Sequence, residues 1–167
     1  IDWEAIEDRG RDLNKPSAWD SPGDIIASAA SSYALDLWAG QPNRVEVWVE
    51  KQALEAVIGQ ACDPLGVPYF ACKGYVSQSA MWRAAQRFAS YRRQGADPIV
   101  IYLGDHDPSG IDMTRDIADR LDTFRVQTEV TRIALNMDLV EEYTPPPNPA
   151  KLTDSRCGAY IKKFGDE

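Results

Sequence analysis

The alternation of short apolar runs with segments of helical periodicity is the feature that most limits what this chain can fold into. Apolar runs at 45–49, 67–72 and 98–103 alternate along the chain with segments of helical spacing at 52–61, 77–88 and 111–121. Runs of the first kind predict strands and those of the second kind predict helices. A fourth strand is predicted over 124–135, with a short helix over 137–142. This alternation predicts an α/β fold with a mainly parallel four-stranded sheet and helices on both faces.

The segments on either side of this core have less regular patterns. Residues 1–44 are expected to form an irregular lead-in and a helix that starts at Asp24 and stops at Gly40. Residues 45–144 form the predicted core. Residues 145–167 form a proline-rich C-terminal extension. The first residue is not a methionine, so we expect the chain to be a piece of a longer protein.

Composition limits the class of protein. At 167 residues with 44% hydrophobic residues, the chain fits one ordinary domain with a packed core. It has no run of about 18 apolar residues, so no membrane span is predicted. Three cysteines without paired spacing and a single histidine disfavour a zinc site, and we expect reduced thiols in a cytoplasmic protein.

The charge balance limits how this chain could bind a nucleic acid. Its formal net charge is -8 at pH 7. Non-specific DNA affinity comes mainly from lysine and arginine side chains that neutralise phosphates. If DNA is the substrate, metal ions or a partner domain must therefore supply positive charge.

Acidic side chains follow two of the predicted strands. Glu50 comes directly after the first strand, and Asp105 and Asp107 follow the third. In parallel sheets the ligand site lies at the carboxyl ends of the strands, so these three carboxylates are expected to converge there. Hard oxygen ligands select Mg²⁺ or Mn²⁺, and Mg²⁺ held by carboxylates is typical of phosphoryl-transfer sites.

Three motifs in this order give the chain a specific resemblance. They are Val49–Ala53 (VEKQA), Cys72–Tyr75 (CKGY) and Gly104–Ile111 (GDHDPSGI). Their order and spacing resemble a Toprim domain, most closely that of the A subunit of the type IIB DNA topoisomerases (topoisomerase VI) and its meiotic double-strand-break relatives. The resemblance covers roughly residues 45 to 155 and implies a Rossmann-like Toprim fold over the predicted core.

The resemblance also implies roles for individual residues. Glu50, Asp105 and Asp107 would be the catalytic and metal-binding carboxylates, with Mg²⁺ or Mn²⁺ as the cofactor. Lys51 and Lys73 would contact the phosphate of DNA. The implied activity is Mg²⁺-dependent cleavage or transesterification of DNA by a protein that assembles as a homodimer.

The chain departs from this family in two respects. Val76 stands where the family has proline, which affects a turn. The nucleophilic tyrosine of such topoisomerases lies on a winged-helix domain, and that domain is expected elsewhere in the parent chain. Three functions therefore stay open: a topoisomerase, a hydrolytic DNA nuclease, and a non-catalytic platform that binds Mg²⁺ and DNA in a larger assembly. A receiver-like domain is disfavoured, because no lysine follows the fourth strand.

Several neighbouring residues have two interpretations. His106 could contact phosphate or transfer a proton, but a turn histidine with a solvent or backbone partner is the favoured interpretation. Asp112 could support the metal, although an acid in the first turn of a helix is also favoured by the helix dipole. Arg83 and Arg87 could follow a DNA backbone or belong to a solvated helix face.

Overall fold

The computed structural model describes residues 16, 18–146 and 155–165. It divides the chain into two compact units, Ile1–Leu35 and Asp36–Glu167. The division falls within the predicted N-terminal region of residues 1–44. Most of the predicted irregular lead-in and part of the proline-rich extension lie outside the described residues.

The first unit contains the helix α1 (Pro22–Ser32). Ser21 begins it, and its hydroxyl oxygen accepts a hydrogen bond of 3.3 Å from the amide of Asp24. No residue of α1 is buried.

The prediction that this helix continues to Gly40 was wrong. At Tyr33 the backbone becomes extended, with ψ 120°. The segment that follows instead makes contacts with the α/β core, because Asp36 binds Arg44 and the Trp38 indole donates to the carbonyl of Leu65 at 2.8 Å. Such tertiary contacts override a weak helical preference.

The second unit is built on a four-stranded sheet. Its strands are β1 (Asn43–Val49), β2 (Tyr69–Ala71), β3 (Asp97–Leu103) and β4 (Glu129–Ala134). Their order is β2-β1-β3-β4, and every neighbouring pair is parallel. The predicted α/β fold with a parallel four-stranded sheet is confirmed.

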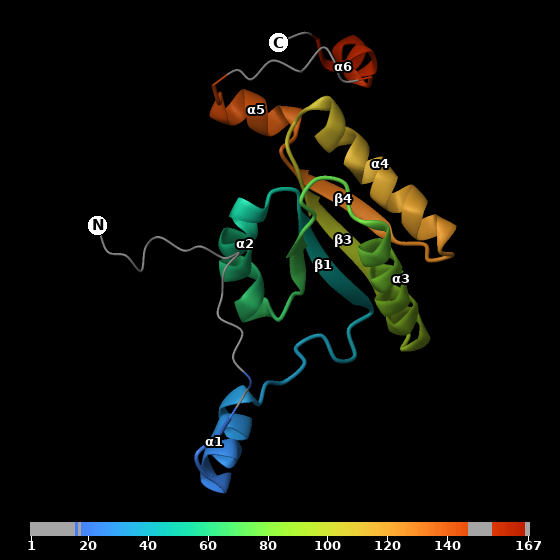
Figure 1. Ribbon diagram of the computed structural model, residues 1–167. Helices are drawn as coiled ribbons and strands as arrows, with labels where there is room; N and C mark the ends of the chain where they lie inside the picture. The colour runs from blue at the N-terminus through green and yellow to red at the C-terminus, as the bar shows by residue number, and fades with distance from the viewer. Residues whose placement is uncertain (1–15, 17, 147–154, 166–167) are drawn as a thin grey trace, which may run out of the picture. The chain divides into compact units, whose positions relative to one another are not determined.

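Helices lie against both faces of this sheet (Figure 1). The helices of this unit are α2 (Glu55–Cys62), α3 (Gln78–Arg93), α4 (Pro108–Thr123), α5 (Met137–Tyr143) and α6 (Cys157–Phe164), with 3-10 turns at Gln52–Leu54 and Asp63–Leu65. The helix α2 covers one face, and α3 and α4 cover the other. Among the described helices, none combines the length and the apolar character needed to cross a membrane.

The alternation of side chains along β1 and β3 produces two cores. On the α3 and α4 face, Trp48, Val100 and Tyr102 pack against buried helix residues, which include Met81, Phe88, Met113 and Ile117. On the α2 face, a smaller cluster surrounds Val47, Cys62 and Val67. The larger core fixes α4 to the sheet, and the residues before α4 form the loop that follows β3.

Several elements differ in length from the prediction, and two of these differences have a clear structural reason. The strand predicted over 124–135 is limited to β4, because Phe124 and Arg125 finish α4, with Arg125 in a left-handed conformation at φ 60°. The polar tail, for which only a helical turn near Tyr160 was expected, contains the helix α6, which packs on α4.

Candidate functional site

The carboxyl ends of β1 and β3 lie side by side in the sheet. Val49 pairs with Leu103, and the amide of Glu50 donates to the carbonyl of Leu103 at 2.8 Å. Each strand therefore delivers its next residues to the same edge. The structure brings Glu50 and Asp105 together there, although they are 55 residues apart in the chain.

Glu50 is almost fully buried at this edge, with a relative exposure of 8%. Its Oε2 atom accepts a hydrogen bond of 3.0 Å from the Asp105 amide and lies 3.5 Å from the Tyr102 hydroxyl. Burial raises the pKa of Glu50 above its ordinary value. The hydrogen bond from the Asp105 amide favours the ionised form and opposes this shift, but burial outweighs it. The charge of Asp105 raises this pKa further. Glu50 is thus a buried acid whose ionisation needs support from cations.

Lys51 supplies one such cation. Its Nζ atom lies 2.7 Å from Asp105 Oδ2 and 3.8 Å from Glu50 Oε1. The hydrogen bond to Asp105 raises the pKa of Lys51, so the ammonium group is charged at neutral pH. The lysine side chain is half-exposed, which leaves it free to exchange this pairing for another anion.

Asp107 has a different position from the other two carboxylates. It is the N-cap of α4, and its Oδ1 atom accepts hydrogen bonds from the Gly110 amide at 2.6 Å and the Ser109 hydroxyl at 2.9 Å. Pro108 follows at the first helical position, where its missing amide is tolerated. One oxygen of Asp107 therefore holds the start of α4, which is the local role of an N-cap aspartate.

Gly110 allows the loop between β3 and α4 to fold tightly. A Cβ atom at this position would overlap the carbonyl oxygen of Asp105 and lie 3.1 Å from Glu50 Oε2. The absence of a side chain lets the first turn of α4 approach both acidic residues.

A cleft of about 150 Å³ opens beside Glu50 and Asp105. Its lining combines the two acids and Lys51 with apolar residues, and consists of Glu50, Lys51, Leu54, Leu103, Gly104, Asp105, Ala134 and Leu135. The cleft thus lies where β1, β3 and β4 end. Its size suits a phosphate group and a few water molecules better than a whole nucleotide.

Arg132 is a site residue that the sequence reasoning missed. It lies on β4, and its guanidinium donates to the carbonyls of Gly104, Asp105 and Gly110 at 2.8, 2.6 and 2.8 Å. An arginine inside a run of valine, threonine and isoleucine was the available signal, because a charge within a partly buried strand requires partners.

His106 turns toward α6. Its Nδ1 atom lies 2.7 Å from the hydroxyl oxygen of Tyr160, which also donates to the carbonyl of His106 at 3.1 Å. The rings of Tyr160 and Phe164 pack edge-on against the imidazole. Burial lowers the pKa of His106, so the ring is mostly neutral at pH 7. The partner of the imidazole is thus the side chain of Tyr160, 54 residues away in the chain, and not the solvent or backbone partner of the favoured interpretation.

The predicted phosphate-contacting residues are in three different settings. Lys73 is exposed in a left-handed conformation at φ 59°, and its amide donates to the carbonyl of Glu50 at 3.0 Å, which places it at the site edge. Arg83 is exposed on α3. Arg87 forms two hydrogen bonds of 2.9 and 2.8 Å with the buried carboxylate of Glu46. The structure brings Lys51 and Lys73 to the site and leaves the two arginines on α3.

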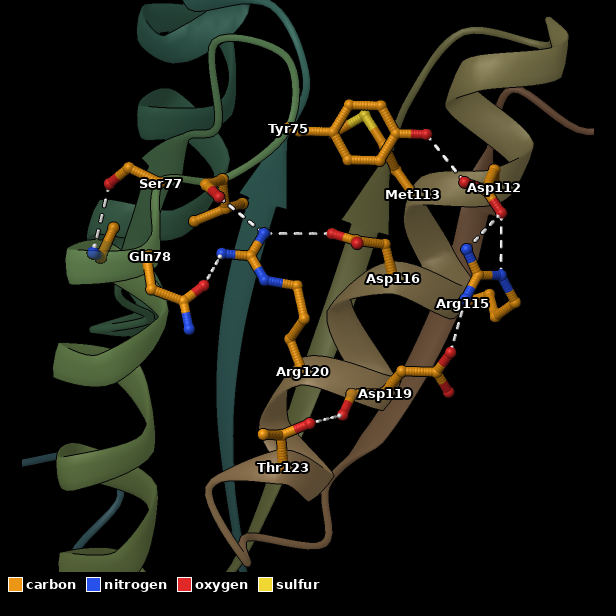
Figure 2. A network of polar contacts seen from close by, with 12 residues as sticks. Tyr75, Ser77, Gln78, Asp112, Met113, Arg115, Asp116, Asp119, Arg120 and Thr123 are labelled. Carbon is orange, nitrogen blue, oxygen red and sulfur yellow. Dashed lines mark hydrogen bonds and ion pairs between the residues drawn. The ribbon is translucent and has the colours of Figure 1, made fainter. Parts of the chain in front are cut away.

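Asp112 belongs to a polar network on the exposed side of α4 (Figure 2). It accepts hydrogen bonds of 2.8 Å from the Tyr75 hydroxyl and from Arg115 Nε, and Arg156 Nε lies 3.2 Å from its Oδ2 atom. Burial and the bond to Asp112 raise the pKa of Tyr75 to about 12. Asp112 thus joins the CKGY motif and the start of α6 to α4.

The carboxylate oxygens of Glu50 and Asp105 at this edge are of the ligand type that hard divalent cations prefer. Within residues 16, 18–146 and 155–165, no group of three or more acidic, histidine or cysteine side chains is arranged to hold a metal ion. Magnesium takes one or two protein carboxylates and keeps several waters, so a magnesium site does not require a group of three such side chains. Comparisons with protein-family models, with curated proteins and with solved structures found no match to this chain.

Proposed function

We propose that this chain is a Toprim-type domain that takes part in Mg²⁺-dependent cleavage or transesterification of DNA. One observation carries the proposal: Glu50 and Asp105 meet at the carboxyl edge of β1 and β3, beside a cleft of about 150 Å³. Ligand sites of parallel sheets lie at this edge. The resemblance of the three motifs to Toprim domains supports the same chemistry.

The side chains of the site have complementary roles in this proposal. Glu50 and Asp105 would hold the cation, with Asp107 supporting the loop as the N-cap of α4. The cation would supply the positive charge that stabilises the phosphate and the leaving oxygen. Lys51 and Lys73 would then bind the phosphate, Lys51 by exchanging its carboxylate partners for the substrate.

A raised pKa suits Glu50 to proton transfer as well. A carboxyl group transfers protons best when its pKa approaches the working pH, and burial moves Glu50 in that direction. The nucleophile would be either water or a hydroxyl from another domain of the parent protein. These two routes leave different products, free DNA ends or a covalent adduct.

A non-catalytic platform that binds Mg²⁺ and DNA is the second candidate. One Asp107 oxygen is occupied by the cap of α4, and Lys51 is paired with Asp105. Both features favour a site that organises an assembly without cutting. Cation binding without any cleavage by the whole protein would identify this function.

The test is calorimetric titration of Mg²⁺ and Mn²⁺ into the wild type, Glu50→Gln and Asp105→Asn, followed by plasmid cleavage with the whole protein. Each substitution removes a ligand charge and is expected to weaken cation binding at least about tenfold, with loss of cleavage by about 100-fold or more. Glu129→Gln is the control, because it also removes a carboxylate charge but Glu129 is exposed at the amino-terminal end of β4, away from the site. Wild-type protein that binds neither cation, with or without DNA, would refute the proposal.

A further inference from the structure

Arg132 makes an unusual set of contacts for a strand residue. Its Nη2 atom donates to the carbonyls of Gly104, Asp105 and Leu135 at 2.8, 2.6 and 2.9 Å. The Nη1 atom donates to the carbonyl of Gly110 at 2.8 Å, and Nε donates to the side chain of Asn136 at 3.1 Å. Every acceptor is an uncharged oxygen.

The contacts of Arg132 span the loop that carries the acidic residues. Gly104 and Asp105 begin this loop and Gly110 ends it, in the first turn of α4. The guanidinium therefore ties the two ends of the loop to each other and to β4. With the ends fixed, the Asp105 amide points at Glu50 and the first turn of α4 stays against both acids.

The charge of Arg132 has no direct counter-ion among the described residues. The side chain is half-buried, and none of the ion pairs between described residues includes it. The nearby negative charges are those of Glu50, Asp105 and Asp107, which act on Arg132 at longer range. The direct contacts of Arg132 with the loop are therefore those to its backbone carbonyls.

We propose that Arg132 is the positioning residue of the acidic site, which holds the loop of residues 104–110 so that Asp105 and Glu50 face the same cleft. This inference rests on the proposed function for its catalytic meaning. A lysine could not replace the arginine, because one ammonium group has three donors and cannot reach both ends of the loop.

A purely structural role would be limited to the end of β4. The bonds from Arg132 to Leu135 and Asn136 fasten that end, and their loss would lower stability without a specific effect on the loop. The two roles differ in which amides become exposed to exchange and in whether cation affinity changes.

Hydrogen exchange in the whole protein separates the two roles. In Arg132→Lys, the amides of Asp105 and Gly110 are expected to exchange at least about tenfold faster, and the Mg²⁺ dissociation constant is expected to rise about tenfold. Arg92→Lys is the matched control, because Arg92 also donates to a backbone carbonyl, that of Gln127, at the other end of the sheet. It is expected to change neither quantity.

A second variant covers the case in which Arg132→Lys does not fold. Asn136→Ala removes the acceptor of Nε and loosens the guanidinium while its charge stays, so a smaller increase in exchange at Asp105 and Gly110 is expected. Unchanged exchange at these two amides in every variant that folds would overturn the inference. Wild-type protein that binds no Mg²⁺ would instead refute the proposed function, and the exchange result would still decide the role of Arg132.

Discussion

Asp112 is the residue where three parts of the chain meet. Tyr75 reaches it from the loop after β2, Arg115 from the next turn of α4, and Arg156 from the residue before α6. Burial alone would raise the pKa of Asp112, but the hydrogen bonds from Tyr75 and Arg115 and the charges of Arg115 and Arg156 outweigh it and lower this pKa. The ionised carboxylate is therefore the form that the fold stabilises.

The lowered pKa makes the contribution of Asp112 to stability depend on pH. Because the folded-state pKa is below the unfolded one, the contribution is full above about pH 4 and is lost as the pH falls through the folded-state pKa. We expect Asp112→Asn to lower the free energy of unfolding by about 1–3 kcal/mol at pH 7, with a smaller loss near pH 2.5. Urea unfolding at both values measures this. An equal loss at both would mean that the charge of Asp112 is irrelevant.

At the scale of single residues, the sequence predicted the convergence of Glu50 and Asp105 because both directly follow apolar strands. It could not predict that Asp107 caps α4, since an aspartate after a strand fits a ligand and a cap equally well. The position of Arg132 within an apolar strand indicates that it has partners, but the sequence could not identify them because they are mainly backbone carbonyls, which every residue type has.

Two of the arginines on the helix α3, Arg87 and Arg83, lie one turn apart and have different surroundings. Arg87 pairs with Glu46, a carboxylate with 2% exposure that also accepts a hydrogen bond of 3.1 Å from the Trp48 indole. Arg83 is exposed. The first arginine is thus an anchor of α3 on the sheet, whereas the second is available to solvent or to a partner.

This contrast predicts unequal costs for the same substitution. Arg87→Ala leaves Glu46 buried and unpaired, so we expect the free energy of unfolding to fall by about 2–4 kcal/mol. Breaking a fully buried pair costs about 3–5 kcal/mol, and the cost here is somewhat lower because the guanidinium is half-exposed. Arg83→Ala is expected to stay within about 0.5 kcal/mol of the wild type. Guanidinium chloride unfolding compares them. Similar costs would show that Glu46 does not depend on Arg87.

At the scale of elements, the strands β1 and β3 could be predicted because buried parallel strands are continuous apolar runs. The helix α6 could not, because its apolar residues meet partners distant in sequence, among them His106. The prediction extended α1 too far for a related reason. Trp38 fits a helical pattern in the sequence, but its side chain packs against the smaller core of the sheet and is not part of a helix.

For the molecule as a whole, the net charge of -8 opposes the approach of DNA. Positive charge at the site edge is limited, and Lys51 is already paired with a carboxylate. A bound divalent cation would therefore change the affinity for DNA more than it would in a basic protein.

We expect duplex DNA to bind weakly in EDTA at physiological salt, with a dissociation constant of about 10⁻⁴ M or weaker, at the weak end of non-specific binding. Addition of Ca²⁺, which also prefers oxygen ligands, is expected to tighten binding at least about tenfold. Fluorescence anisotropy with labelled DNA measures both states, and Glu50→Gln is expected to abolish the gain. Micromolar binding in EDTA would contradict this view of the charge.

The strand order also determines the stage of folding at which Glu50 and Asp105 come together. During synthesis β1 and β2 emerge first, and two paired strands alone are only marginally stable. The later strand β3 must insert beside β1, and only then does Asp105 reach Glu50 across 55 residues of chain. The repulsion between the two acids therefore arises only once β3 has paired with β1, when three of the four strands are available to oppose it.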